Sequence, residues 1–451
     1  MGRLFGTDGV RGIAVTELTC ELALQIGKAL TSSLRERGSN HPRVIVGKDT
    51  RLSSDVLEAA FCAGICAAGG DAICIGVIAT PGVAYTVKSR GADAGAMISA
   101  SHNSMEFNGI KLYGRDAFKL TEERIAVIES KILDHPEQLR LVSGSAIGRI
   151  IHDTQAREEY ISYLARLISC RLDGLHIAVD CANGAASTTA QELFTRLGAK
   201  VDVLFAQPDG LNINAGCGST HIDRLMDHVA STDCQVGLAF DGDGDRCLAV
   251  DETGELVDGD KMIAIFAKSL KEQGRLQRNS VVVTVMSNLG FTYFAKEAGI
   301  RRITANVGDR FVLDKMLDGG FNLGGEQNGH IFFLDDATTG DGQLAGLRLL
   351  ELMQTKHCRL SELACIMKRF PQVMINVRIP NYLRENWKND EEITRLIDRH
   401  EEELGGAGRI LVRESGTEPL IRVMIEGKDF NQINRIAMDI SEKIRERVGE
   451  M

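Results

Sequence analysis

The sequence predicts an α/β protein of three similar units, followed by a smaller α+β domain. Two observations support this fold class. A short apolar strand, a loop rich in glycine or polar residues, a helix and a second strand recur three times along the chain. After residues 368–371 the order changes to strand, helix, two strands and helix. The length of 451 residues agrees, because domains usually hold roughly 100–200 residues.

The first unit shows the pattern most clearly. Apolar residues recur every four positions from Leu18 to Leu30, which predicts one buried face of a helix. A strand at 44–47 is followed by a helix that we expect Ser53 or Ser54 to cap, and by a strand at 72–76. Strands that alternate with helices in this way indicate a parallel sheet.

The second and third units repeat this order, and the last domain departs from it. The expected elements of the second unit are strands at 176–180, 201–205 and 236–240 and a helix at 188–197; those of the third are strands at 281–286 and 302–305 and a helix at 291–298. The last domain is expected to hold strands at 373–379, 409–413 and 420–425 and helices at 391–404 and 430–448.

Composition limits the function classes. The net charge of -10 and the pI near 5.6 argue against nucleic-acid binding, which needs a basic surface. The 11 cysteines are scattered and contain no C-x-x-C pair, so we expect free thiols in a reducing compartment. No signal-peptide core opens the chain, and no apolar run approaches the ~20 residues of a membrane span. We therefore expect a cytoplasmic protein without membrane partners.

Ser101 is the candidate reactive residue. The apolar strand that begins near Ala96 ends in the polar run at 99–103, SASHN, and becomes apolar again at Ile110. Such an ending presents hydroxyls at the edge of a sheet, where α/β enzymes place their chemistry. The alternative is a serine that merely ends a strand. A hydrolase triad is not expected, because no G-x-S-x-G motif surrounds Ser101.

The segment 240–246, FDGDGDR, predicts a metal site. Asp241, Asp243 and Asp245 alternate with glycines, so three carboxylates can converge on one hard cation, for which we expect Mg²⁺. Without a cation, two such charges about 4 Å apart repel by about 4 kcal/mol at an effective dielectric of about 20. Three alternatives stay open: an EF-hand, a phosphatase with Asp241 as nucleophile, and a solvated acidic turn. Arg246 and the flanking strands disfavour the EF-hand.

A third signal predicts phosphate binding. The stretch RESGTEP combines a guanidinium, hydroxyls and an open backbone between two strands, and another arginine lies on the second of these strands. The residues are Arg413, Ser415, Gly416, Thr417 and Arg422. The alternative is a hairpin turn with a surface arginine. Thr7, Arg11, Lys48 and Arg51 form a second, weaker set of basic and hydroxyl groups.

A fourth signal predicts sugar recognition. In GGEQNGH, Glu326, Asn328 and His330 alternate, so in an extended loop they would point the same way. Carboxylate, amide and imidazole groups can bind sugar hydroxyls. A polar turn without a ligand is the alternative.

Together these segments resemble the α-D-phosphohexomutase superfamily. SASHNS, FDGDGDR, GGEQNGH and RESGTEP match its serine, metal, sugar and phosphate loops in the family's order, across nearly the whole chain. GRLFGTDGVRG at the start, CGSTH at 217–221 and VGDRFV at 307–312 resemble the branch that acts on glucosamine phosphates. Two positions depart from the pattern: Ser104 replaces a usual proline, and Asn328 replaces a usual serine.

The resemblance implies four domains around a central cleft. Three related α/β domains with mixed sheets would span 1–152, 153–254 and 255–368, and an α+β domain similar in topology to TATA-binding protein would span 369–451. It also implies an isomerase that interconverts glucosamine 6-phosphate and glucosamine 1-phosphate and so feeds UDP-N-acetylglucosamine synthesis. A hexose 1,6-bisphosphate would be both intermediate and activator. The alternatives are a mannose or glucose phosphate mutase, a Mg²⁺-dependent sugar phosphatase, and a sugar-phosphate sensor without turnover.

The resemblance also assigns roles to residues. Ser101 would be the phosphoserine and would bind Mg²⁺ together with Asp241, Asp243 and Asp245. The implied catalytic groups are Ser101, Lys111, Arg11 and His102, with Lys111 as the candidate general acid and base. The implied substrate-binding residues are Glu326, Asn328, His330, Arg413, Ser415, Gly416, Thr417, Arg422 and Arg246. The expected partner is a small sugar phosphate, and the resemblance allows a homodimer.

Overall fold

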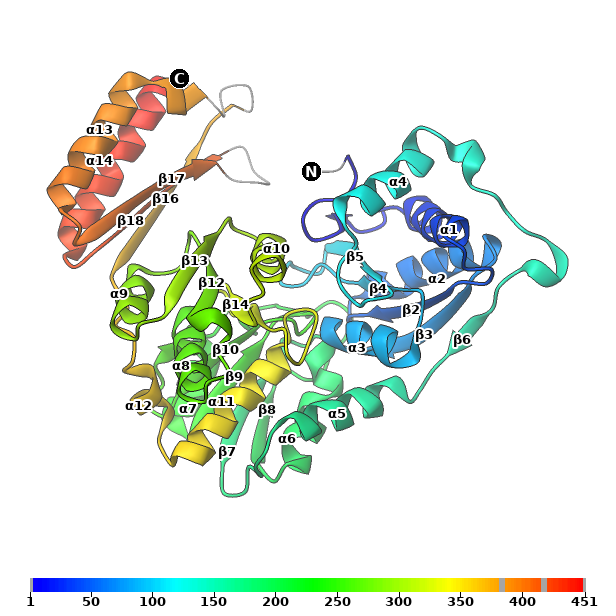
Figure 1. Cartoon of the computed structure of the whole chain (residues 1–451), viewed down its shortest axis with the longest axis horizontal. Helices are drawn as coiled ribbons and strands as arrows, with labels where there is room; N and C mark the ends of the chain where they lie inside the picture. The colour runs from blue at the N-terminus through cyan, green and yellow to red at the C-terminus, as the bar shows by residue number, and fades with distance from the viewer. Residues whose placement is uncertain (1–2, 381–385, 415–419, 449–451) are drawn as a thin grey trace. The chain divides into compact units, whose positions relative to one another are not determined.

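The computed structural model describes residues 3–380, 386–414 and 420–448. The chain divides into two compact units, which we describe separately. Unit 1 comprises Met1–Met286 and Ile300–Ile366, and unit 2 comprises Ser287–Gly299 and Met367–Met451. Unit 1 holds three sheets with their helices, and unit 2 holds a fourth sheet (Figure 1).

The first sheet of unit 1 has six strands in the order β1-β5-β4-β2-β3-β6. Its strands are β1 (Val10–Ile13), β2 (Arg43–Lys48), β3 (Asp71–Val77), β4 (Ala94–Ile98), β5 (Phe107–Gly114) and β6 (Ile150–His152). The helices along this part of the chain are α1 (Cys20–Glu36), α2 (Leu52–Ala67), α3 (Thr80–Arg90) and α4 (Glu122–Leu133). β2 pairs in parallel with β3 and β4, whereas β5 pairs antiparallel with β4 and β1.

The second sheet has the order β11-β10-β9-β7-β8. Its strands are β7 (His176–Asp180), β8 (Lys200–Leu204), β9 (Val236–Phe240), β10 (Cys247–Asp251) and β11 (Leu256–Val257), and its helices are α5 (Ala156–Leu167), α6 (Ala190–Arg196) and α7 (Asp223–Ser231). β7 pairs in parallel with β8 and β9, and β10 pairs antiparallel with β9.

The third sheet has the order β13-β12-β14-β15. Its strands are β12 (Ser280–Thr284), β13 (Arg301–Ala305), β14 (Leu323–Gly325) and β15 (Ile331–Phe333). The helices of this part of unit 1 are α8 (Gly259–Glu272), α10 (Asp309–Gly319), α11 (Gly342–Lys356) and α12 (Leu360–Ala364). β12 is parallel to β13 and β14, and β15 is antiparallel to β14.

The three sheets share one strand order, which confirms the repeat. The orders β5-β4-β2-β3, β10-β9-β7-β8 and β15-β14-β12-β13 match strand for strand, and the end strand is antiparallel each time. In each repeat a hairpin loop joins the third strand to this antiparallel strand. These loops, residues 99–106, 241–246 and 326–330, contain the serine, aspartate and GGEQNGH motifs. The topology thus places three motifs at equivalent positions.

Unit 2 is the predicted α+β domain. Its sheet, β16-β18-β17, is fully antiparallel and consists of β16 (Gln372–Arg378), β17 (Gly408–Glu414) and β18 (Leu420–Gly427). Its helices are α9 (Leu289–Glu297), α13 (Glu391–Leu404) and α14 (Phe430–Val448). Apolar residues of α13 and α14 pack on the sheet as one core. The fold class is therefore confirmed, while the exact domain bounds and the likeness to TATA-binding protein stay predictions.

Two local predictions are wrong. Helix α2 begins at Leu52, before the expected serine cap, and its N-cap residue Arg51 makes no capping bond through its side chain. Ser54 Oγ instead donates to Asp49 Oδ1 (2.8 Å). The helix expected at 188–197 is a 3-10 turn (Ala185–Thr188) followed by α6, because Thr189 between them leaves helical geometry at φ -131°.

Two further expectations concern the membrane and the thiols. Among the described helices, none is both long and apolar enough to cross a membrane. All of the cysteines lie in described parts of the chain and are free thiols, as predicted.

Two buried glycines allow helices α1 and α2 to pack closely. A Cβ atom on Gly27 would overlap the carbonyl oxygen of Phe61, and one on Gly64 would overlap that of Leu24. Because the obstacle is backbone rather than a flexible side chain, a larger residue would force the helices apart.

We predict that Gly64→Ala destabilises unit 1. Helix propensity alone predicts a gain of up to about 1 kcal/mol, whereas overpacking costs about 1–3 kcal/mol. Because the added methyl group would overlap backbone, the cost of overpacking exceeds the gain in helix propensity. The midpoint of urea unfolding should therefore shift to a lower urea concentration. The control Ala63→Ser, at an exposed position of the same helix, should change stability by less than about 0.5 kcal/mol. A Gly64→Ala protein as stable as the wild type would contradict this packing argument.

Candidate active site

Ser101 lies in the hairpin loop between β4 and β5 and is almost fully buried. Its φ of 53° is in the left-handed region, which residues other than glycine rarely adopt. Its Oγ donates a hydrogen bond to Asp241 Oδ2 (2.5 Å) and lies 3.4 Å from His102 Nδ1. The first and second hairpin loops therefore meet at one hydroxyl group.

Two side chains hold the serine loop in this strained form. Arg51 Nη2 donates to the carbonyl oxygens of Ser101 (3.2 Å) and Asn103 (2.5 Å). Asn214 Nδ2 donates to the same two oxygens, at 2.9 and 3.0 Å. Arg51 is itself buried and paired with Asp49. Strained backbone persists where the surrounding structure fixes it, and it gathers at functional sites.

The aspartate loop is buried between antiparallel strands. Asp241 and Asp243 are inaccessible to solvent, and Asp245 is 3% exposed. Strands β9 and β10 flank the loop, so it is not an EF-hand, which helices would flank. The burial also excludes a solvated acidic turn.

These three aspartates fit a divalent cation. One carboxylate oxygen from each lies within 4.8 Å of the others. Burial, followed by the charges of Asp245 and Asp243, raises the pKa of Asp241 to about 8. Within the described residues, Asp243 Oδ1 is buried and accepts no hydrogen bond. The group already attracts one positive charge, because Lys111 Nζ lies 2.8 Å from Asp243 Oδ2 and 3.2 Å from Asp245 Oδ2.

Close backbone approach joins the aspartate loop to its neighbours. A Cβ atom on Gly242 would lie only 2.5 Å from the carbonyl oxygen of Ser101, so glycine is needed there. Thr80, the first residue of α3, donates from its Oγ1 to Asp243 Oδ2 (2.7 Å). The loop is thus fixed from two sides.

A second group of charges surrounds Asp8. This aspartate was not identified as a site residue from the sequence. Asp8 pairs with Arg11 on β1, with Lys119 (2.5 Å) and with Lys111 on β5 (3.3 Å). Burial opposes ionisation of Asp8, but these three cations lower its pKa. Lys119 also pairs with Asp309 at the start of α10. The signals available in the sequence were the motifs GTDGVRG and VGDRFV, which contain the two aspartates.

His102 and Arg246 belong to the same two hairpin loops: His102 follows Ser101, and Arg246 follows Asp245. The charge of Arg246 and burial lower the pKa of His102 to about 3, so its imidazole is neutral at neutral pH. The backbone of Arg246 forms a bridge with that of His330, which connects the second and third hairpin loops.

The GGEQNGH segment is a tight turn, and not the extended loop in which the three side chains would point the same way. Gly329 N donates to the carbonyl oxygen of Glu326 (3.1 Å), so the residues do not alternate along one line. Glu326 and His330 are buried, whereas Asn328 is exposed. His330 Nδ1 lies 3.4 Å from Asp245 Oδ1, and Glu326 Oε1 accepts from Gly308 N (3.0 Å). The third loop therefore reaches the aspartates through His330.

The phosphate-loop prediction concerns unit 2. Arg413 on β17 and Arg422 on β18 occupy directly opposite register positions. Like charges so placed repel, and burial together with Arg422 lowers the pKa of Arg413. Such a pair favours an anion between the two groups. The three other predicted phosphate-binding residues, Ser415, Gly416 and Thr417, lie outside the described residues.

The weaker N-terminal set does not form one anion site. Lys48 Nζ is paired with Asp55 (2.7 Å) and Glu58 (2.5 Å), and Arg51 is buried against Asp49. Only Arg11 of these basic residues joins the charged group around Asp8.

Four family models match this chain in order. They describe phosphoglucomutase/phosphomannomutase alpha/beta/alpha domains I, II and III and the C-terminal domain, and they match residues 2–138, 158–254, 258–370 and 374–443.

Full-length relatives and solved structures agree with these matches. The chain is 49% identical over 449 residues to the phosphoglucosamine mutase of Clostridium novyi (strain NT), with 100% of both chains covered. A phosphoglucomutase/phosphomannomutase family protein from Burkholderia thailandensis has the same fold, with a TM-score of 0.81, 24% identity and coverage of 98% and 97%. An N-acetylphosphoglucosamine mutase from Aspergillus fumigatus, solved with GlcNAc-6P and magnesium, gives a TM-score of 0.64 at 17% identity, with coverage of 98% and 95%.

The predicted resemblance is thereby confirmed, and the chain belongs to the phosphoglucomutase/phosphomannomutase family of the phosphohexomutase superfamily.

Proposed function

We propose that this protein is a phosphoglucosamine mutase, an isomerase that interconverts glucosamine 6-phosphate and glucosamine 1-phosphate. The observation that carries the proposal is the buried Ser101 hydroxyl, which donates to a carboxylate of a three-aspartate loop. Phosphoryl transfer needs such an oxygen beside a site that can offset negative charge. The full-length identity of 49% to a phosphoglucosamine mutase supports the choice of sugar.

Ser101 carries the phosphoryl group between the two ends of the sugar. The bond from its Oγ to phosphorus breaks as the C1 oxygen of glucosamine 6-phosphate bonds to that phosphorus, which gives the 1,6-bisphosphate. After the bisphosphate turns over, Ser101 Oγ takes the 6-phosphoryl group, and glucosamine 1-phosphate leaves. Each attacking hydroxyl loses a proton, and Nζ of Lys111 is our candidate to carry it.

We propose Mg²⁺ as the cation of the aspartate loop. Asp241, Asp243 and Asp245 would hold it together with an oxygen of phosphorylated Ser101. When bound, it offsets charge on the transferring phosphoryl group. Lys111 Nζ lies beside the same carboxylate oxygens, so the cation would compete with it for Asp243 and Asp245, while its pairing with Asp8 can remain.

The remaining site residues bind the substrate and the activator. We propose that Glu326, Asn328, His330 and Arg246 contact the sugar, and that Arg413, Arg422 and the 415–417 loop hold the phosphate that is not transferring. A hexose 1,6-bisphosphate would maintain phosphorylation of Ser101. We also propose a cytoplasmic location, which the free thiols favour.

The test of this function is a mutase assay with a substrate panel. Protein with Mg²⁺ and a trace of hexose 1,6-bisphosphate receives the 6-phosphates of glucosamine, mannose and glucose, and both 1-phosphate and free phosphate are measured. We expect the highest kcat/KM with glucosamine 6-phosphate and no release of phosphate. Ser101→Ala should abolish turnover, because it removes the oxygen that carries the phosphoryl group, and its melting temperature should stay close to the wild-type value.

The matched control is Ser104→Ala, since this serine is exposed in the same loop and should be dispensable. A preference for mannose or glucose would reassign the sugar but keep the mechanism. Free phosphate as main product, with activity surviving in Ser101→Ala, would replace the mutase by a phosphatase. Binding of all three sugar phosphates without any product would indicate a sensor.

We predict that turnover depends on a divalent cation held by Asp241. Chelation should abolish activity, and Mg²⁺ should restore it. In Asp241→Asn, kcat/KM should fall by roughly 10³-fold, since loss of such a cation removes several kcal/mol of charge stabilisation. Mg²⁺ should raise the melting temperature of the wild type but not of this variant. Asp318→Asn, at an exposed position of α10, serves as the control. Full activity of chelated protein would refute the assignment.

A further inference from the structure

A second cluster of side chains that can bind a metal lies beside the second sheet of unit 1, away from the aspartate loop. His176 begins β7, Asp202 lies on β8, and Cys234 comes two residues before β9. Asp241 follows the other end of β9, and a strand of this length spans roughly 13 Å. Because β7, β8 and β9 run parallel, the cluster belongs to the opposite end of the sheet from the candidate active site.

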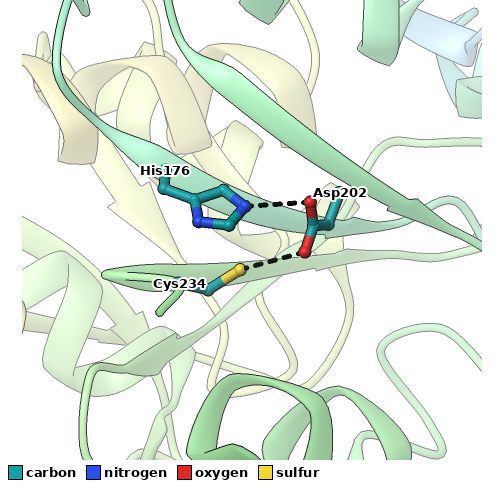
Figure 2. A group of neighbouring side chains, drawn as sticks. All are labelled: His176, Asp202 and Cys234. Carbon is teal, nitrogen blue, oxygen red and sulfur yellow. Dashed lines mark hydrogen bonds and ion pairs between the residues drawn. The ribbon is translucent and has the colours of Figure 1, made fainter. Parts of the chain in front are cut away.

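The three side chains converge on one point. His176 Nε2 lies 2.8 Å from Asp202 Oδ1, and Cys234 Sγ lies 3.5 Å from Asp202 Oδ2. Figure 2 shows the imidazole, from the start of β7, and the thiol, from the loop before β9, both directed at the carboxylate of Asp202. One ligand atom from each residue lies within 4.8 Å of the others.

These distances are close to those of a zinc site. Zinc bonds of ~2.0–2.3 Å in tetrahedral geometry place ligand atoms roughly 3.4–3.6 Å apart. The thiol and carboxylate atoms already satisfy this spacing. The imidazole contacts the other carboxylate oxygen, Oδ1, at 2.8 Å and would need to move away from it by roughly 0.6–0.8 Å. Nitrogen, sulfur and oxygen ligands together suit Zn²⁺, whereas Mg²⁺ prefers oxygen alone.

The outer partners also have the arrangement of a metal site. Asp233 Oδ1 lies 2.9 Å from His176 Nδ1, so it can accept that N–H and leave Nε2 available as a ligand. His228 Nε2 lies 3.1 Å from Asp202 Oδ2 and orients the carboxylate. Lys200 Nζ lies 3.3 Å from His176 Nδ1, but its side chain is mostly exposed and can turn away.

The cluster has access to solvent. The side chains of Asp202 and His228 are about one third exposed, and Asp233 and Cys234 line a surface cavity. An ion can therefore arrive without unfolding of the domain.

We propose that His176, Asp202 and Cys234 form a structural Zn²⁺ site, with water as the fourth ligand. The ion displaces the proton of the Cys234 thiol and the proton that His176 Nε2 shares with Asp202; both are released to solvent, while His176 keeps its Nδ1 proton toward Asp233. The bound ion links the starts of β7 and β9 to β8, so its role is to stabilise the second sheet. The proposal does not depend on the mutase assignment, because none of these residues is placed in the active site.

The test uses Co²⁺ and Zn²⁺ on the full-length protein in excess Mg²⁺. A Co²⁺–thiolate bond gives charge-transfer absorption in the near ultraviolet, which the aspartate loop cannot give because it has no sulfur ligand. We expect saturable absorption in the wild type that Zn²⁺ displaces. Zn²⁺ should also raise the melting temperature.

Three variants make the test specific. Cys234→Ser should lose the absorption and the thermal shift, whereas Cys20→Ser, a half-buried cysteine on α1, should keep both. Asp233→Asn should keep the absorption but weaken binding by roughly 10–100-fold, because it removes only the outer partner of His176. A cooperative melting transition without added metal checks that each variant is folded. Absent absorption in the wild type, or full absorption in Cys234→Ser, would mean that the cluster is a hydrogen-bond network only.

Discussion

Three buried carboxylates in one short loop are the constraint on which the site depends. One carboxylate oxygen from each of Asp241, Asp243 and Asp245 lies within 4.8 Å of the others, all three residues are buried, and such a group is unfavourable until positive charge offsets it. Lys111 supplies part of that charge, and a divalent cation can supply the rest. The same negative group that attracts a cation also accepts the Ser101 hydroxyl. The proposed metal binding and the proposed phosphoryl transfer therefore depend on the same buried negative charge.

The fold brings the necessary groups together by repetition. Each of the three sheets ends its third strand in a hairpin loop, and these loops hold Ser101, the aspartates and His330. The second loop contacts both others, through Ser101 and Asp241 and through Asp245 and His330. One topological position thus carries three proposed roles: the reactive oxygen, the metal ligands and a sugar contact. Glycine at position 242 leaves the space that the carbonyl oxygen of Ser101 occupies.

The sequence predicted most of the fold because strand and helix periodicity is local. The bounds of α13 and α14 agree with the prediction residue for residue, and the motifs identified the Ser101 and Asp241 loops. Long-range partners could not be predicted in this way. Asn214 lies in no recognised motif, and the motif that contains Asp8 does not show that this residue pairs with Lys111. The conformation of GGEQNGH could not be predicted either, because alternation along the chain says nothing about a glycine that closes a turn.

The most direct test of the account follows the phosphoryl group itself. Protein phosphorylated by a hexose 1,6-bisphosphate with labelled phosphorus is isolated and mixed with unlabelled glucosamine 6-phosphate in a single turnover. If Ser101 carries the group, the label leaves Ser101 and appears in sugar phosphates, with none in inorganic phosphate. Label released as inorganic phosphate, or equal label uptake by protein that lacks the Ser101 hydroxyl, would contradict the claim that this serine carries the group.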